Sequence, residues 1–395
     1  MSDIRLETAL VRPTNFVFRA VSSMTRTQGV TAVPSLGPLA AFTGTFSGNG
    51  FNTIFRPDNT TTPTVLPTPV TSDNILELNL TSETLSFSPG LGSVPNRGEV
   101  QGDIFLNGVP YLQSISDITV PTQPVGIHFE PGLWMIVPAT TDPQEVVTLV
   151  RMASIPHGTT INAQGTFSTA NGPPTIPAVD ITPFTIGNPG ARIPFPSQTV
   201  TNNPPNNPTA RIPQDLTSFN SAGTITQAIL SDPNTVLRNH IATQNITSTT
   251  TISISTNPAA PPLISSNPTA PAFGGGTDNI AFLLGNSTAS APNADAIQMQ
   301  AVFWIETVEH TILVPIFKPG QRPLVLTPSA GEQGEPVPRF QVTPTVEITA
   351  PKPITVSSTQ IQYSQQVLLN FNGLSWPHVS VATLVPSDPI PVPWS

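Results

Sequence analysis

Histidine is scarce in this sequence, and one histidine stands where a barrel would place a ligand-binding side chain. The chain contains five histidines in 395 residues. His378 opens the run 378–385, whose apolar residues mostly alternate, as in a strand with one buried face. If His378 points into a closed barrel, a neutral imidazole faces an apolar cavity, where it can bind a metal or haem iron. The alternative is a strand-end histidine that hydrogen-bonds to backbone at the barrel rim.

A second histidine shares a strand face with a carboxylate and a tryptophan. His128 and Glu130 are two residues apart, so a strand places both side chains on one face, together with Trp134. Inside a barrel, His128 would orient water or a ligand, and Trp134 would form part of the cavity wall. On the outer face, His128 and Glu130 would only interact with solvent, and Trp134 would be an ordinary core residue.

The other three histidines give weaker signals. His157 lies in the turn-like segment 155–159, where a solvent-exposed side chain is expected. His240 lies on the apolar face of a predicted helix. His310 follows two glutamates, but strand alternation puts these on opposite faces, which argues against a metal site.

Composition indicates an all-β protein with long loops. Charged residues make up 9% of the chain, against about 25% in an average globular protein. Proline accounts for 48 residues, more than twice its usual share of roughly 5%. Proline disfavours helix interiors and threonine suits strands. With 37% apolar residues, the chain can still form one sizeable core.

The same composition argues against several classes of protein. Because there is no cysteine, disulfides, thiolate catalysis, zinc–thiolate sites and iron–sulfur clusters are excluded. A net charge of −9 without a basic cluster argues against nucleic-acid binding. No apolar stretch approaches the roughly 18 residues of a membrane helix, and the N-terminus lacks a signal-peptide pattern. We therefore expect a cytoplasmic protein without a membrane span.

Short strand patterns follow one another at near-regular spacing, which is typical of a sandwich or barrel. They lie at 75–80, 84–88, 103–106, 109–115, 126–137, 146–152, 249–256, 280–284, 299–305, 311–317, 342–348, 360–371 and 378–385. Asn107-Gly108 is a strong hairpin signal between two of them. The region 224–244 is predicted to be helical, with Asp232 as its cap and Pro233 in its first turn.

We therefore predict an all-β fold, either a sandwich or an antiparallel barrel, whose strands come from two separate parts of the chain. Residues 1–35 form an N-terminal segment, and 36–168 contain the first set of strands. Residues 169–290 form a Pro/Asn/Thr-rich insertion with one short helix. Residues 291–395 supply the closing strands.

Three stretches, in this order, resemble the nitrobindin family of haem-binding β-barrels. The first, 36–54, carries Leu-x-Pro-Leu, Gly-Thr-aromatic and glycine-rich patterns, with Phe46 where the family has tryptophan. The second, 107–134, carries Gly-x-Pro-Tyr-Leu and then His-x-Glu-x-Gly, with Met135 where the family has arginine. The third, 377–381, is similar to the family's final strand, whose histidine holds the haem iron.

The resemblance implies an antiparallel β-barrel of the calycin type, formed by 36–168 and 291–395, with 169–290 as a large insertion or as a lid on the barrel. It also implies a haem b cofactor and a set of site residues. His378 would be the axial ligand of the iron, and His128 and Trp134 would lie beside the haem. Haem propionates need basic side chains at the rim, for which Arg56 and Arg151 are the candidates because both close strand patterns. The family implies ferric haem acting on reactive nitrogen or oxygen species, including peroxynitrite isomerisation. A peroxidase-like, haem-sensing or haem-storage role is equally open.

Two other functions fit the residues. The cavity of the same barrel would suit a non-enzymatic carrier of an apolar small molecule such as a fatty acid or terpenoid. Low charge, abundant Pro, Thr and Asn, and the absence of cysteine also suit a structural or surface protein without a ligand. A small molecule or haem is thus the main predicted partner, and the oligomeric state is left open.

Overall fold

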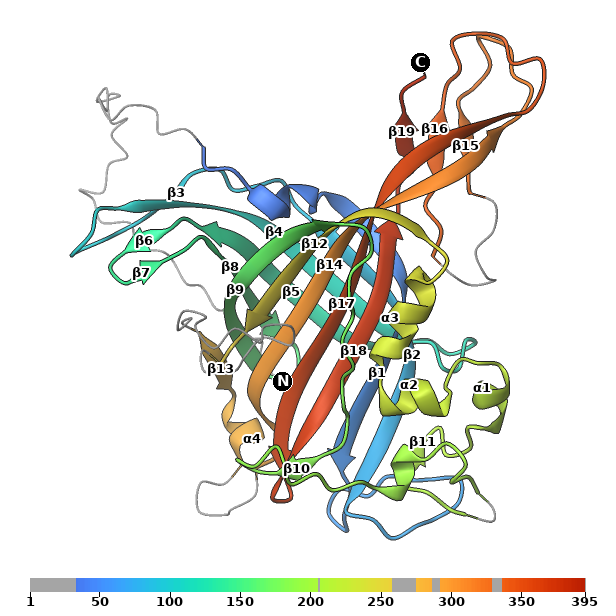
Figure 1. The fold of residues 1–395 in the computed structure, drawn as a ribbon. Helices are drawn as coiled ribbons and strands as arrows, with labels where there is room; N and C mark the ends of the chain where they lie inside the picture. Colours follow the sequence, from blue (N-terminus) through green and yellow to red (C-terminus); the bar gives the residue numbers. More distant parts are fainter. Residues whose placement is uncertain (1–32, 205–206, 258–274, 286–291, 329–335, 395) are drawn as a thin grey trace, which may run out of the picture. The chain divides into compact units, whose positions relative to one another are not determined.

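Ten antiparallel strands close into a barrel in the computed structural model (Figure 1). The structure describes residues 33–204, 207–257, 275–285, 292–328 and 336–394. Strands account for 51% of the structure and helices for 9%, so the predicted all-β antiparallel barrel is confirmed. The barrel strands are β1 (Gly44–Pro57), β2 (Asn74–Phe87), β4 (Ile104–Asp117), β5 (Val125–Val137), β8 (Thr148–Ile155), β9 (Thr159–Asn171), β12 (Asn245–Ser255), β14 (Asp295–Val314), β17 (Lys352–Phe371) and β18 (Leu374–Pro386).

These strands follow one another around the barrel in chain order, and β18 pairs with β1 to close the ring. In the closing pair, Asn52 lies opposite Ser380, and Phe51 lies opposite Val381. Side chains alternate between the two faces of a strand. Asn52 and Ser380 therefore point into the barrel, whereas Phe51 and Val381 pack in a second core on its outer face.

The hairpin predicted at Asn107-Gly108 is wrong. Strand β4 passes through both residues without turning, and the Asn107 side chain accepts hydrogen bonds from the backbone N–H groups of Gly92 and Gly108. Glycine is required here by a close approach of two strands. A Cβ atom on Gly108 would lie 2.3 Å from the carbonyl oxygen of Trp134 on β5.

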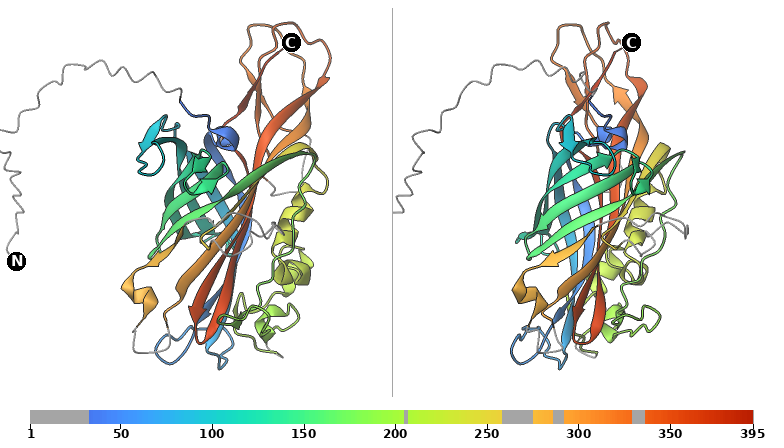
Figure 2. Two further views of the ribbon diagram at one scale, coloured as in Figure 1. Left: turned by 60° about the vertical axis from the view of Figure 1, so that its left-hand side comes forward. Right: turned by 90° about the vertical axis from the view of Figure 1, so that its left-hand side faces the viewer.

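The segment between β9 and β12 wraps one outer face of the barrel (Figure 2). Its apolar side chains pack against outward-facing barrel residues, so that Leu237 of the wrap shares a core with Phe55 and Trp376 of the strands. Its elements are β10 (Phe184–Thr185), η2 (Pro196–Gln198), β11 (Arg211–Ile212), α1 (Thr217–Ser221), α2 (Gln227–Ser231) and α3 (Asn234–Ile241).

The region predicted to be one helix contains two. Helix α2 ends at Ser231 and α3 begins at Asn234, because Pro233 has no backbone N–H with which to continue the first helix. The predicted cap, Asp232, lies between the two helices: it directly follows α2, Pro233 is the N-cap residue of α3, and the Asp232 side chain accepts a hydrogen bond from the backbone N–H of Asn234. Among the described residues, no helix has the length and apolar character needed to cross a membrane.

The remaining elements lie mainly at the two ends of the barrel. At the lower end in Figure 1 lie β13 (Gly276–Asn279) and α4 (Ala281–Leu284). Both belong to the predicted insertion, 169–290, which also contains barrel strand β12. At the upper end, extensions of β14 and β17 enclose a small core with Phe317 and Phe340. The other elements of the described chain are η1 (Gly37–Ala41), β3 (Val94–Asn96), β6 (Thr140–Thr141), β7 (Gln144–Glu145), β15 (Leu324–Leu326), β16 (Phe340–Val342) and β19 (Ile390–Val392).

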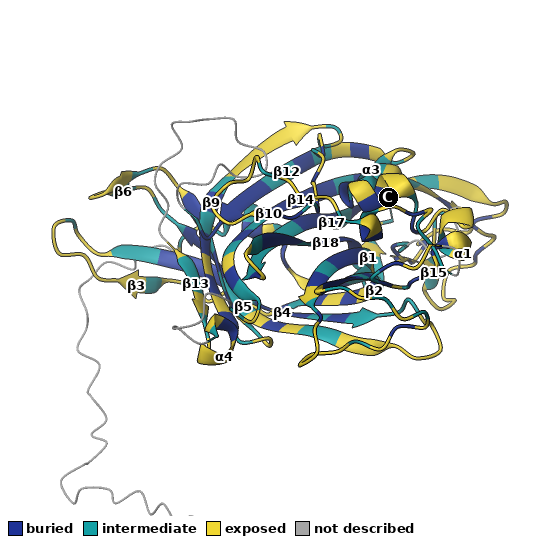
Figure 3. Cartoon of the chain, turned by 90° about the horizontal axis from the view of Figure 1, so that it is seen from below, coloured by how far each residue is buried: buried dark blue, intermediate teal, exposed yellow. Residues whose placement is uncertain are grey.

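One half of the barrel interior is filled and the other half is hollow. In the filled half, Leu39 of η1 and Phe42, which directly follows η1, pack in the main apolar core. The same core contains inward-facing side chains such as those of Trp134 and Phe303. The ring of Phe42 stacks on that of Phe87 with 4.5 Å between centroids. Seen from below, buried residues follow the strands around the barrel (Figure 3). The hollow half contains the candidate site.

Candidate functional site

Two adjoining cavities occupy the hollow half of the barrel, with volumes of about 320 Å³ and about 200 Å³. The residues that line both are Ile54, His128, His157, Gln365 and His378. The larger, which we call the polar cavity, is also lined by Asn52, Asn79, Gln113, Tyr363 and Ser380. The smaller, the apolar cavity, is also lined by Ile155, Ile161, Leu283, Met299, Val367 and Leu369.

His378 faces into the barrel from β18. Its Nδ1 lies 2.9 Å from the carbonyl oxygen of Thr53 on β1. A carbonyl oxygen can only accept, so Nδ1 carries the proton and Nε2 of the neutral ring keeps its lone pair. Burial lowers the pKa of His378 to about 4, despite the opposing effect of the Thr53 hydrogen bond. The ring is therefore neutral at pH 7, and Nε2 has no hydrogen-bond partner in the described part of the chain.

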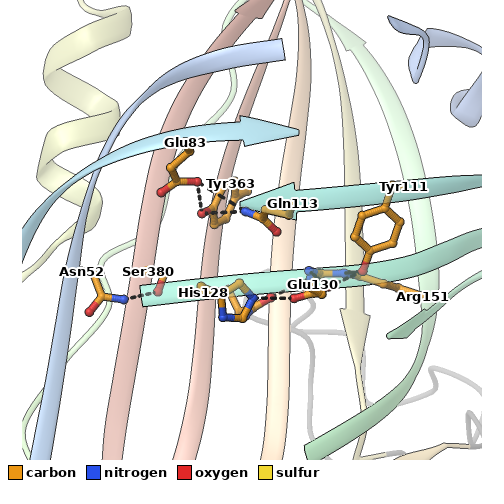
Figure 4. A network of polar contacts seen from close by, with 10 residues as sticks. Asn52, Glu83, Tyr111, Gln113, His128, Glu130, Arg151, Tyr363 and Ser380 are labelled. Carbon is orange, nitrogen blue, oxygen red and sulfur yellow. Dashed lines mark hydrogen bonds and ion pairs between the residues drawn. The ribbon is translucent and has the colours of Figure 1, made fainter. Parts of the chain in front are cut away.

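His128 is held by a buried ion pair (Figure 4). Its Nε2 lies 3.0 Å from Oε2 of Glu130, whose Oε1 accepts a hydrogen bond from Arg151 at 2.5 Å. Burial by itself would raise the pKa of Glu130, but the Arg151 charge and the His128 hydrogen bond outweigh it and lower the pKa to about 2. Because Glu130 is ionised at pH 7, His128 donates from Nε2, and Nδ1 remains for water or a ligand.

Arg151 lies inside the barrel and not at its rim, where a partner for propionates was predicted. Its side chain is 2% exposed and lies opposite Trp134 in the pairing of β5 with β8. The guanidinium donates to Glu130, to the hydroxyl of Tyr111 at 2.8 Å and to Oε1 of Gln365 at 2.7 Å. Because Glu130 already compensates its charge, Arg151 is not available to the carboxylates of a ligand.

Two further predicted site residues, Trp134 and Arg56, do not line either cavity. Trp134 is 1% exposed and packs edge-on against Phe42 and Phe303, with ring centroids 5.6 and 5.1 Å away. It is a core residue because β5 runs from the hollow half into the filled half. Arg56 lies near the end of β1 with a half-exposed side chain and pairs with Glu77 at 3.0 Å. Glu77 lines the polar cavity, so this pair marks the cavity rim.

His157 lies in the turn between β8 and β9, where an exposed side chain was predicted. It is exposed, yet it also lines both cavities, and its ring centroid is 5.8 Å from that of His128. Partial desolvation and the nearby His128 lower the pKa of His157. His240 and His310 line a separate pocket. Within the described ranges, no group of three or more His, Asp or Glu side chains could hold a metal ion.

Sequence reasoning missed a second buried network, which borders the polar cavity (Figure 4). The hydroxyl of Tyr363 donates to Oε2 of Glu83 at 2.6 Å. The Gln113 amide lies 3.1 Å from that hydroxyl and 3.3 Å from Oε2. Glu83 is 2% exposed, and burial raises its pKa. A signal was present, because strand alternation puts Glu83 on the same face as the core residue Leu85.

This arrangement suits an apolar ligand that also needs one coordinating nitrogen. The apolar cavity provides a wall of aliphatic side chains and Met299. His378 adds an uncharged lone pair where the two cavities meet. His128 and Gln113 provide hydrogen-bonding groups at the wall of the polar cavity.

Comparisons with known proteins add little. No family model matches the sequence, and no curated protein matches it. A solved structure found as similar is the crystal structure of Rv2717c from M. tuberculosis, with a TM-score of 0.32 and 10% sequence identity. The match covers 90% of this chain and 99% of that chain. A likeness of this size supports no conclusion about function, which must come from the site.

Proposed function

We propose that this protein binds haem b in the two cavities, where His378 would hold the iron through Nε2. The observation that carries the proposal is the hydrogen bond from His378 to the Thr53 carbonyl. It fixes the tautomer and leaves the lone pair of Nε2 for a ligand, as metal-binding histidines require. Ligation also requires a deprotonated nitrogen, and the pKa of about 4 ensures this at neutral pH.

The volume and the mixed polar and apolar lining of the cavities around His378 also support a small-molecule ligand. Together the two cavities fall within the range of roughly 300–1,000 Å³ that is common for small-molecule sites. The aliphatic side chains and Met299 of the apolar cavity would contact the cofactor. Of the two basic residues predicted to bind propionates, Arg56 keeps a half-exposed side chain near the rim, whereas Arg151 is committed to Glu130.

The residues around the cofactor would set access and hydrogen bonding. Bound haem would supply redox chemistry toward reactive nitrogen or oxygen species, the activity implied by the resemblance to nitrobindins. His128 would hold water or a small ligand through Nδ1, because Glu130 occupies its Nε2. Gln113 would present a further hydrogen-bonding group to the polar cavity. A haem sensor or store would use the same contacts without a reaction.

A visible absorption spectrum after addition of haem to the purified protein tests this proposal. We expect a Soret band that titrates to one haem per chain and that is lost or strongly shifted in His378→Ala. His240→Ala is the matched control, because His240 lies outside the two cavities and its loss should leave the band unchanged. A normal Soret band in folded His378→Ala would overturn the assignment of the ligand.

A second function, carriage of an apolar small molecule, is favoured by the chemistry of the apolar cavity. Among the residues that the structure describes, no Asp, Glu, Lys or Arg side chain lines it. Native mass spectrometry of the protein purified without added ligand tests this possibility. A retained fatty acid or terpenoid, together with no Soret band after haem addition, would favour the carrier and exclude haem.

A further inference from the structure

The chain contains two tyrosines. Both lie inside the barrel, and the hydroxyl of each forms a hydrogen bond with a buried glutamate. Tyr111 is 5% exposed, and its hydroxyl donates to Glu130. Tyr363 is 2% exposed, and its hydroxyl donates to Glu83 at 2.6 Å. In a chain without cysteine, phenols and indoles are the side chains from which a one-electron oxidant most readily takes an electron.

The two phenols differ in the charge around them. Tyr111 also accepts a hydrogen bond from Nε of Arg151 at 2.8 Å, so a cation lies beside it and opposes the loss of an electron. Its carboxylate partner, Glu130, is a weak base because its pKa is lowered to about 2. Proton transfer from Tyr111 to Glu130 is therefore unfavourable.

The partner of Tyr363 is a better proton acceptor. Glu83 forms no ion pair within the described residues, and its hydrogen-bond partners are the neutral groups of Thr81, Gln113 and Tyr363. Burial raises the pKa of Glu83, so its carboxylate binds a proton more strongly than an exposed one would. Burial also raises the pKa of Tyr363 well above its ordinary value, so the phenol stays protonated until it is oxidised.

Access to the cavity also distinguishes the two phenols. Tyr363 lines the polar cavity together with His378 and His128. Tyr111 does not line either cavity, and its ring lies beside Trp134 with 6.5 Å between centroids. An oxidant in the polar cavity therefore meets Tyr363 first.

We propose that Tyr363 is a redox-active tyrosine that gives one electron to an oxidant in the polar cavity while its phenolic proton passes to Glu83. The O–H bond of Tyr363 breaks and an O–H bond forms on Oε2 of Glu83. A one-electron oxidant such as nitrogen dioxide is reduced to nitrite. The products inside the wall are a neutral tyrosyl radical and a neutral carboxylic acid, so no uncompensated positive charge is created in the buried site.

This inference rests on the proposed function only for the choice of a reactive nitrogen species as the oxidant, and haem is not needed to test it. Its consequence is that Tyr363 removes oxidising equivalents from the cavity that contains His378. Failure of haem binding and failure of tyrosine oxidation are separate results, because the first is read from the Soret band and the second from modified tyrosine in protein without haem.

The test is nitration of the haem-free protein by peroxynitrite, which decomposes to nitrogen dioxide. The tyrosyl radical combines with a second nitrogen dioxide at a ring carbon next to the phenolic one, and transfer of the proton on that carbon to the phenolic oxygen gives 3-nitrotyrosine. Peptide mass spectrometry distinguishes the two sites, because each tyrosine lies in its own peptide. We expect Tyr363 to exceed Tyr111 about tenfold, a barrier difference of roughly 1.4 kcal/mol. Equal nitration, or more at Tyr111, would overturn the proposal.

Variants separate proton transfer from simple access to the cavity. Glu83→Gln keeps the size of the side chain but removes the proton acceptor, and nitration of Tyr363 should fall about tenfold. Glu83→Asp keeps a carboxylate and should restore part of the reaction. His240→Ala is the control, because His240 lies outside the two cavities, and nitration of Tyr363 should stay within about twofold. Unchanged nitration in folded Glu83→Gln would overturn the proposal, and the comparison of Tyr363 with Tyr111 in the wild type decides it if this variant does not fold.

Discussion

The filled and hollow halves of the barrel are built from the same strands, yet their interiors differ. Strand β5 contributes His128 to the hollow half and Trp134 to the filled half, and β18 contributes His378 and Leu384 in the same way. The strand backbones therefore run through both halves, and the side chains that they carry differ between the halves. The filled half contains large apolar side chains from the strands, together with Leu39 and Phe42 from η1 and the residue that follows it. The hollow half contains histidines and small or aliphatic side chains.

The Glu130–Arg151 ion pair lies where the two halves meet. Arg151 lies over the rings of Trp134 and Phe303 on one side and donates to the cavity residue Gln365 on the other. The two halves therefore differ in role, one in stability and the other in the candidate site. Packing in the filled half stabilises the barrel and fixes the ion pair, and the ion pair fixes the orientation of His128.

The largest expected effect contrasts one residue from each half. Trp134→Ala should lower the free energy of unfolding by about 4 kcal/mol, because it leaves a cavity among close-packed rings. His378→Ala should change it by less than about 1 kcal/mol at pH 7, because the site already faces open space. Urea denaturation of both variants measures the difference. Equal losses would show that the hollow half is as important for stability as the filled half.

The next effect concerns the boundary between the halves. Arg151→Met should cost about 3 kcal/mol, because it leaves the Glu130 carboxylate buried without a compensating charge. The double variant Glu130→Gln/Arg151→Met removes both charges and should recover much of this loss. Urea denaturation of the single and double variants gives the coupling. A double variant as unstable as the single one would mean that charge compensation is not the role of the pair.

A smaller effect is the pH dependence of the free energy of unfolding that His378 of the hollow half contributes. The pKa of His378 is lowered to about 4 in the folded protein, below its ordinary value near 6.5. As pH falls from about 6.5 to about 4, the unfolded chain binds this proton first, so the free energy of unfolding decreases. Because His378 is partly exposed, we expect the free energy of unfolding to decrease by roughly 2 kcal/mol over this pH range. His378→Ala should lack this contribution, and identical pH profiles for the two proteins would contradict the assignment.

The smallest expected effect uses two alanines on the same strand. Ala301 lies in the filled half and Ala296 lines the apolar cavity, both on β14. Ala301→Leu should cost about 1.5 kcal/mol through overpacking. Ala296→Leu should stay within about 0.5 kcal/mol, because the added carbons enter the cavity, and it should weaken ligand binding. Thermal unfolding compares the two, and an equal cost at both positions would show that the cavity is not free space.

The sequence predicted correctly which side chains share a strand face. It did not predict whether a side chain lies in the filled or the hollow half of the barrel. Alternation put His128, Glu130 and Trp134 on one face, and all three point inward. It did not show that Trp134 lies in the filled half or that Arg151 is buried beside it, because depth depends on the register between strands. Local sequence patterns could not predict the hydrogen bond between Glu83 and Tyr363, because the two residues are 280 positions apart in the chain.

The sequence by itself determined an all-β fold of many short strands, the lack of cysteine, and the strands that carry His128 and His378. These follow from composition and alternation, which are local properties. The tertiary structure decided which strands meet, that His157 joins the cavity wall, and that Thr53, 325 residues away, fixes the tautomer of His378. Such contacts arise from ring closure and register, which depend on all ten strands together.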